Sequence, residues 1–127
     1  MNADVRAVLA LARGRPDVQP ASWSNALEIA VKERCAALAW HRSGAEIRRL
    51  APADIVQRWR SEAIAAVDLA AMWEAVLART LPALRTAGVE PVVLKGLPLG
   101  IRLYGTTAAR PSRGANMICR TVNAMCE

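Results

Sequence analysis

The spacing of apolar residues predicts a helical first part of the chain. Within residues 3–13, apolar side chains recur every three or four positions, as they do on one face of an α-helix. Gly14 is expected to end this helix. A second helix is expected to begin at Asn25, which forms a plausible capping box with Glu28, and to end near Ser43 and Gly44.

A third and longer helix is expected to begin near Pro52, a residue type that suits the first helical turn. Pro82 is expected to kink or restart this helix, and Gly88 is expected to stop it. Its apolar positions follow steps of three or four throughout, so one long face is expected to point to a core. These positions are Ile55, Trp59, Ala63, Ala66, Ala70, Trp73, Leu77, Leu81 and Leu84.

The pattern changes after Gly88. A short β-branched segment predicts a buried strand from Pro91 to Leu94. A short helix is then expected to end at Gly105, residues 106–114 are expected to form a loop, and a second strand is expected to begin near Asn116. The predicted fold is therefore α+β, with a mainly helical region over residues 1–88 and a different unit over residues 89–127.

Composition and charge add little that is specific. The chain has 127 residues, of which 26 are Ala, and a net charge of +6 that comes from 15 Arg and two Lys. A basic balance favours a polyanionic partner, but these residues are spread along the chain instead of forming one run. A nucleic-acid binder ranks last, because no helix-turn-helix or basic aromatic platform is recognisable.

The sequence does not support a zinc site, a signal peptide or a membrane-spanning segment. Three Cys without a CxxC pair and a single His do not predict a structural zinc site, and Cys35 is expected to be a small core residue. The first residues do not match a signal peptide, and no apolar run is long enough to span a membrane. We therefore expect a cytoplasmic protein with no membrane association.

The segment after the predicted strand could bind phosphate. It does not match the Walker A motif, because Lys95 precedes Gly96 and no Ser or Thr follows, and its glycines are wrongly spaced for GxGxxG. A strand that leads through a small residue into a helix can instead present free N–H groups to phosphate, with Lys95 as a cation beside them.

The stretch "PVVLKGLPLGIRLYGTTAARPS" resembles the start of the catalytic core of uncharacterised bacterial nucleotidyltransferases, which are related to the polymerase-β superfamily. That family has an apolar strand, Leu-Lys-Gly, a short helix ending in Leu-Tyr, Arg-Pro with a small residue, and then Asp-x-Asp and an apolar strand. The matching elements are Leu94-Lys95-Gly96, Leu103-Tyr104 and Arg110-Pro111-Ser112.

The resemblance implies a fold, a reaction and a set of ligands. It implies that residues 89–127 start a nucleotidyltransferase core and that the intact family transfers a nucleoside monophosphate from an NTP to an acceptor that remains unknown. Mg²⁺ and NTP are the implied cofactor and substrate. Lys95, Gly96 and Arg110 are the implied nucleotide- and phosphate-binding residues.

The chain departs from the family where the acidic motif is due. Residues 114–116 are Gly, Ala and Asn, and no Asp or Glu lies between Glu90 and Glu127. Mg²⁺ prefers carboxylate oxygen, so we assign no catalytic and no metal-binding residue and expect no transfer activity. We also expect the chain to hold only the first part of the core.

Two explanations of this departure stay open. The acids were substituted in a degenerate homologue, or a change of reading frame near residue 113 replaced the tail. The codons of Met117 and Ile118 contain an Asp codon in another frame, followed by Leu or Met, which supports the second explanation. The coding DNA downstream of codon 113 decides between them.

A different class of function is also open. A non-catalytic helical module could bind a partner, or a second copy of the chain, through the apolar face from Ile55 to Leu84. Apolar surface that an incomplete sheet leaves exposed would favour such association.

Overall fold

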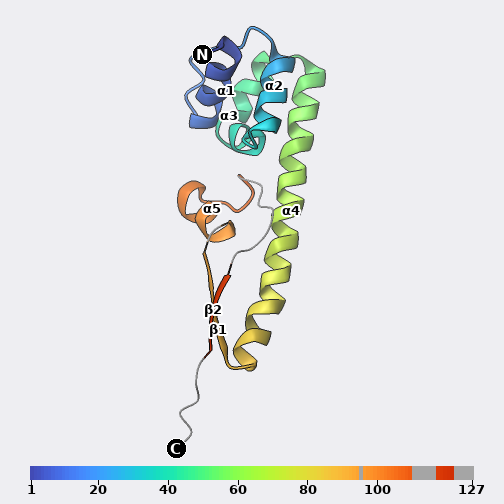
Figure 1. The fold of residues 1–127 in the computed structure, drawn as a ribbon. Coiled ribbons are helices and arrows are strands. Elements are labelled where there is room, and N and C mark those ends of the chain that lie inside the picture. The colour runs from blue at the N-terminus through green and yellow to red at the C-terminus, as the bar shows by residue number, and fades with distance from the viewer. Residues whose placement is uncertain (95, 110–116, 122–127) are drawn as a thin grey trace, which may run out of the picture.

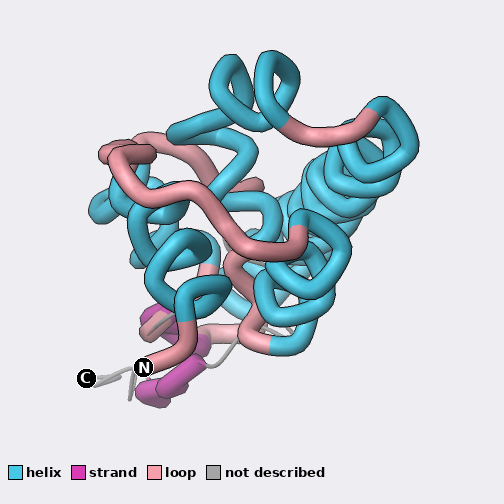
Figure 2. The backbone as a smooth tube through the Cα atoms, turned by 90° about the horizontal axis from the view of Figure 1, so that it is seen from above, coloured by secondary structure: helices cyan, strands magenta, loops and turns pink. Residues whose placement is uncertain are grey.

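The computed structural model describes residues 1–94, 96–109 and 117–121, which form five helices and a two-stranded sheet (Figures 1 and 2). This arrangement confirms the predicted α+β class. In chain order the elements are α1 (Ala3–Arg13), α2 (Trp23–Lys32), α3 (Ala36–Leu50), α4 (Ala53–Thr86), β1 (Val89–Val93), α5 (Leu97–Tyr104) and β2 (Met117–Thr121).

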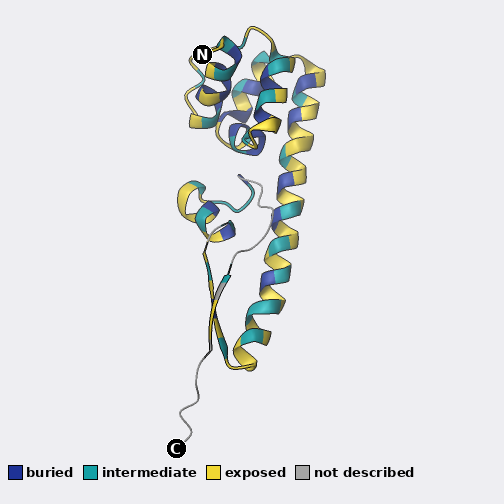
Figure 3. Ribbon diagram, viewed as in Figure 1, coloured by how far each residue is buried: buried dark blue, intermediate teal, exposed yellow. Residues whose placement is uncertain are grey.

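The first three helices pack with the N-terminal part of α4 around one core. Figure 3 shows the buried faces of these helices turned toward one another. Trp59 of α4 is fully buried there, and its indole N–H donates a hydrogen bond of 2.9 Å to the carbonyl oxygen of Ala36. The ring of Trp23 meets that of Trp59 edge-on, with 6.3 Å between the ring centroids. Such aromatic contacts add to the energy of apolar burial.

The N-terminus of α2 differs from the prediction. Ser22, not Asn25, is the N-cap residue, and its hydroxyl accepts a hydrogen bond from the Asn25 backbone N–H. The Asn25 side chain instead donates to the carboxylate of Asp4, at 2.7 Å. Asp4 also accepts bonds from the backbone N–H groups of Ala21 and Ser22, so one buried carboxylate ties α1 to the start of α2.

The predicted second helix is in fact two helices. Helix α2 ends in a Schellman motif, in which the Cys35 N–H bonds to the Ala30 carbonyl and the Arg34 N–H to the Val31 carbonyl. Arg34 takes the left-handed conformation of this motif, at φ 61°. Helix α3 continues to Leu50, but it has a kink at Ser43, where the sequence predicted the helix end and where the backbone is non-helical. The Ser43 hydroxyl donates to the Leu11 carbonyl at 2.7 Å.

Helix α4 is one continuous element of 34 residues, about 51 Å long at 1.5 Å per residue. It runs through Pro82 to Thr86, so the predicted restart does not occur. Pro82 leaves the Ala78 carbonyl without its helical partner, but both residues are exposed, so water can bond to that carbonyl. The C-terminal stop was predicted correctly, since Ala87 caps the helix and Gly88 follows at φ 80°.

The apolar face of α4 points to a core, as predicted, but it serves two separate clusters. Its first part joins the core of the N-terminal helices through Ile55 and Trp59. Farther along, Ala70 and Leu77 pack with Leu97 of α5, and partly buried side chains of β1 and β2 complete this second cluster. Figure 1 shows α4 running beside both groups of elements.

Strands β1 and β2 are antiparallel, and Val93 pairs with Met117 while Val89 pairs with Thr121. The bounds of these strands and of α5, which ends at the left-handed Gly105, agree with the predicted elements to within about two residues. The predicted burial of the first strand was wrong, because only Pro91 of β1 is buried and Val92 is 54% exposed. None of the helices described is long and apolar enough to cross a membrane.

Candidate functional site

The turn between β1 and α5 is the candidate site. Gly96 immediately precedes α5 and has φ 83° and ψ −116°, a conformation that side chains with a Cβ rarely adopt. Its carbonyl accepts the first helical bond, from the Gly100 N–H at 2.9 Å. Among the described residues no side chain caps the helix, and Pro98 has no N–H in the first turn. The first N–H groups of a helix lack intrahelical partners, and helix N-termini of other proteins bind phosphate through such groups.

The sheet register places a second segment at the same end. Because β1 and β2 are antiparallel and Val93 pairs with Met117, β2 begins where β1 ends. The turn at Gly96 and the entry to β2 therefore share one end of the sheet. In the family pattern, this entry is where the acidic motif is expected.

Close packing holds α5 against α4. Leu97 is buried against Ala70 and Leu77 of α4. The segment after α5 folds back on the helix, since a Cβ atom added to Gly100 would lie 3.2 Å from the Thr106 carbonyl oxygen. The hydroxyl of Thr107 donates to the carboxylate of Glu74 on α4, at 2.6 Å. These contacts fix the helix whose N-terminus forms the candidate site.

A second contact joins α5 to the N-terminal helices. The guanidinium carbon of Arg42, on α3, lies 5.5 Å from the centroid of the Tyr104 ring, a cation–π distance. Sequence reasoning missed this pair and the Thr107–Glu74 bond. Their members are separated by 62 and 33 positions in the sequence, so no local spacing could indicate them.

Of the three predicted phosphate-binding residues, Gly96 lies where the family pattern places it. Lys95 and Arg110 lie outside the described residues, as do the Gly, Ala and Asn at 114–116. Gly96 thus lies in the turn before α5, and the assignment of Gly96, Lys95 and Arg110 to phosphate binding stays a prediction.

The described residues do not fit the Mg²⁺ ion that the family implies. Within residues 1–94, 96–109 and 117–121, no three His, Cys, Asp or Glu side chains are grouped to hold a metal ion. Glu74 already accepts the bond from Thr107, and Glu90 pairs with Arg120 at 2.8 Å. We therefore derive no reaction step through a metal.

Cys35 is not suited to act as a nucleophile. It is half-buried and packs against the N-terminal core, as the sequence predicted. Burial raises the pKa of its thiol, so the thiol stays protonated at neutral pH.

Comparison with known proteins identifies the family. A family model described as uncharacterised nucleotidyltransferase matches residues 19–114, a range that begins before α2 and extends past α5. No curated protein and no solved structure matches the chain. The matched range covers most of the chain and includes the turn at Gly96. The chain therefore belongs to the uncharacterised nucleotidyltransferase family.

Proposed function

We propose that this chain binds the triphosphate of an NTP at the turn between β1 and α5 but does not transfer a nucleotide. The observation that carries the proposal is Gly96, with its positive φ of 83°, before a helix N-terminus that no described side chain caps. In this proposal the backbone N–H groups contact phosphate oxygens, and Lys95 and Arg110 add charge-assisted contacts. Residues 1–88 act as the supporting helical region.

The lack of transfer is proposed from residue chemistry. The family pattern calls for Asp-x-Asp at or next to position 114, and this chain has Gly114, Ala115 and Asn116. An Asn carbonyl is neutral, and Gly has no side-chain oxygen, so these residues cannot balance the charge of a divalent ion.

Calorimetric titration with ATP in EDTA tests the phosphate site. Lys95→Ala is expected to weaken binding roughly fivefold to tenfold, or about 1–1.4 kcal/mol, because it removes one exposed charge-assisted contact. Lys32→Ala is the matched control, since Lys32 is the only other Lys and lies exposed on α2. Equal affinities for the wild type and Lys95→Ala would remove the phosphate role of this turn.

Restoring the acids tests the second half of the proposal. The double change Gly114→Asp and Asn116→Asp is expected to make ATP binding tighter when Mg²⁺ is added, whereas the wild type shows little response. Gly114→Asn, which adds bulk without charge, serves as the control. Pyrophosphate release from Mg²⁺-ATP by the wild-type chain would contradict the proposed inactivity.

Self-association is the second candidate function. The long face from Ile55 to Leu84 that the sequence suggested as an interface is largely covered by the chain itself. Ile64 and Val67, however, lie on another face of α4 and are 51% and 54% exposed. Exposed neighbouring apolar side chains of this kind favour association with a second copy.

Size-exclusion chromatography with light scattering tests this second candidate. A dimer that becomes a monomer on Ile64→Ser and Val67→Ser would support it. Val92→Ser is a suitable control, because Val92 is equally exposed but lies on β1. A wild-type chain that stays monomeric at high protein concentration would refute it.

A further inference from the structure

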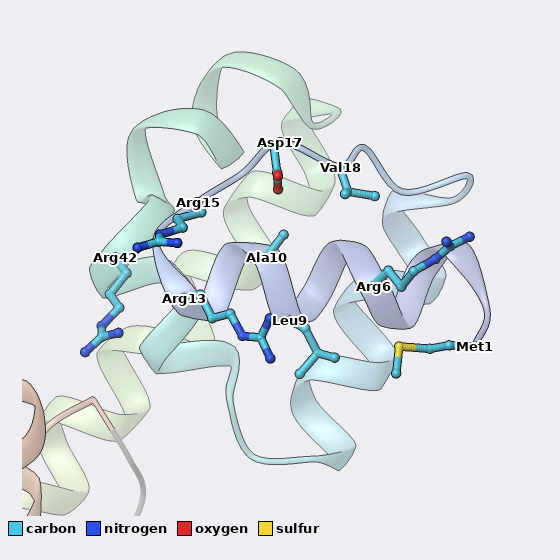
Figure 4. Close-up of a pocket in the computed structure, with 9 residues that line it drawn as sticks. All are labelled: Met1, Arg6, Leu9, Ala10, Arg13, Arg15, Asp17, Val18 and Arg42. Atoms are coloured by element: carbon cyan, nitrogen blue, oxygen red, sulfur yellow. The ribbon is translucent and has the colours of Figure 1, made fainter.

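A groove of about 660 Å³ lies along α1 at the far end of the molecule from the sheet (Figures 1 and 4). Four arginines line it: Arg6 and Arg13 from α1, Arg15 from the connector to α2, and Arg42 from α3. Grooves of this size commonly hold small-molecule ligands. Three separate segments thus bring like charges to one concave surface.

The arginines are spread along the whole groove. Arg6 and Arg13 are seven residues apart, which is about 10.5 Å along a helix axis and nearly the same face. Figure 4 shows Arg6 toward the N-terminal end of α1 and Arg15 next to Arg42 at its other end. The end of α1 lies close to α3 there, since a Cβ added to Gly14 would make an ordinary van der Waals contact of 3.5 Å with the Cβ of Arg42.

The groove has a net positive charge. Its four arginines and one carboxylate, that of Asp17, leave +3. Within the part of the chain that the structure describes, none of these arginines forms an ion pair. Arg42 contacts only an uncharged ring, that of Tyr104. Guanidinium groups bind phosphate through paired N–H donors, so the open charge favours a phosphate-bearing ligand.

Apolar surface lies between the charged ends. Leu9 is 38% exposed and lies between Arg6 and Arg13 along α1, and Val18 is 37% exposed on the connector. Figure 4 shows Val18 and Asp17 on the connector that passes along α1. A ligand that fills this groove would therefore combine anionic groups with an apolar or planar part.

We infer that this groove binds a phosphorylated small molecule of the nucleoside diphosphate class. Such a ligand has about three negative charges, which match the +3 of the groove, and a planar base that can cover Leu9 and Val18. The inference is independent of the proposed triphosphate site at Gly96, since the two sites share no residue. Arg42 is the one groove residue that also touches α5, through Tyr104.

The experiment is calorimetric titration of the full chain with ADP in EDTA, made in a Lys95→Ala background. That background weakens binding at the Gly96 turn, and the arginine substitutions below alter only groove residues, so a loss that they cause is assigned to the groove and not to the Gly96 turn. Adding Arg6→Gln and Arg13→Gln is expected to weaken ADP binding at least tenfold. The matched control, Arg79→Gln with Arg85→Gln, removes the same charge from exposed positions on α4 and is expected to change affinity less than twofold.

Three further ligands sharpen the result. Pyrophosphate is expected to bind more weakly than ADP because it lacks the base, and adenosine is expected not to bind. An equal loss of ADP affinity in both double variants would overturn the proposal. Tighter binding of a single-stranded oligonucleotide than of ADP, with an equal loss of oligonucleotide affinity in both double variants, would also overturn it. That pattern would show general attraction to basic charge. Thermal unfolding of each variant, followed by circular dichroism, checks that the fold is retained.

Discussion

Replacing Trp59 by Phe tests whether the core of the N-terminal helices is built around this residue. Trp59 is fully buried, and its indole N–H bonds to the Ala36 carbonyl. Losing that bond costs about 1 kcal/mol. The smaller ring leaves a cavity of roughly 40 Å³, which costs about another 1 kcal/mol at about 24 cal/mol per Å³. We therefore expect Trp59→Phe to lower the free energy of unfolding by about 2 kcal/mol.

Thermal denaturation followed by circular dichroism measures this loss. A chain of 127 residues gains about 0.27 kcal/mol/K of unfolding entropy, at about 2.1 cal/mol/K per residue. A loss of about 2 kcal/mol thus lowers Tm by about 7 °C. Urea titration at 25 °C gives an independent value of the same free energy, from the midpoint at constant m.

The control for this substitution is Trp40→Phe. Trp40 packs against the same core but is only half-buried, and the Arg48 guanidinium carbon lies 4.8 Å from its ring centroid. Because that ring contact survives in Phe, the expected loss is below about 1 kcal/mol. If the free energy of unfolding of Trp59→Phe lies within about 0.5 kcal/mol of the wild-type value, the reasoning is refuted. It is also refuted if Trp40→Phe loses more free energy of unfolding than Trp59→Phe.

Three further substitutions have defined outcomes. Hydrogen bonds from the Asn25 side chain and from the backbone N–H groups of Ser22 and Ala21 hold the pKa of Asp4 below its ordinary value of 3.8. The stability that the ionised Asp4 contributes is therefore complete above pH 3.8 and is lost as pH falls through the lowered pKa. Asp4→Asn should flatten the acid limb of a pH series of urea titrations, and an unchanged limb would contradict this. Ser43→Ala should cost only about 1 kcal/mol in urea titration, because the Leu11 carbonyl keeps its bond from Gly14; a loss above about 3 kcal/mol would show a larger role. Gly105→Ala should cost about 1–2 kcal/mol in thermal unfolding, since Gly105 has φ 72° with open space around it, and an unchanged Tm would contradict the assigned conformation.

The predicted helices were right where the chain itself carries the stop signal. Helices α1 and α2 end in the same Schellman motif, but the left-handed position is Gly14 in α1 and Arg34 in α2. A glycine in the sequence predicts such a helix end and an arginine does not, so the end of α2 was missed. The N-cap of α2 was missed for a related reason. Asn25 is a good cap by type, but tertiary structure uses its side chain to bond Asp4.

The candidate site was predictable to the extent that it lies in one continuous segment. Gly96 was found because a strand, a glycine and a helix follow one another within a few residues. The arginine groove was not found, because Arg6, Arg15 and Arg42 come from three different segments. In the sequence these arginines are dispersed basic residues that form no recognisable motif. Packing of α1 on α3 brings them together, and no spacing in the sequence reports that packing.

The division of α4 between two clusters also has a consequence for local unfolding. Among the described residues, ten buried side chains, Trp59 included, form the first cluster, whereas only three form the second cluster at Ala70 and Leu77. Hydrogen exchange reports opening free energies residue by residue. Amides of α4 around Trp59 should exchange only with global unfolding, and those near Leu77 should exchange sooner, together with β1 and α5. The turn at Gly96 would then open and close while the N-terminal helices remain folded.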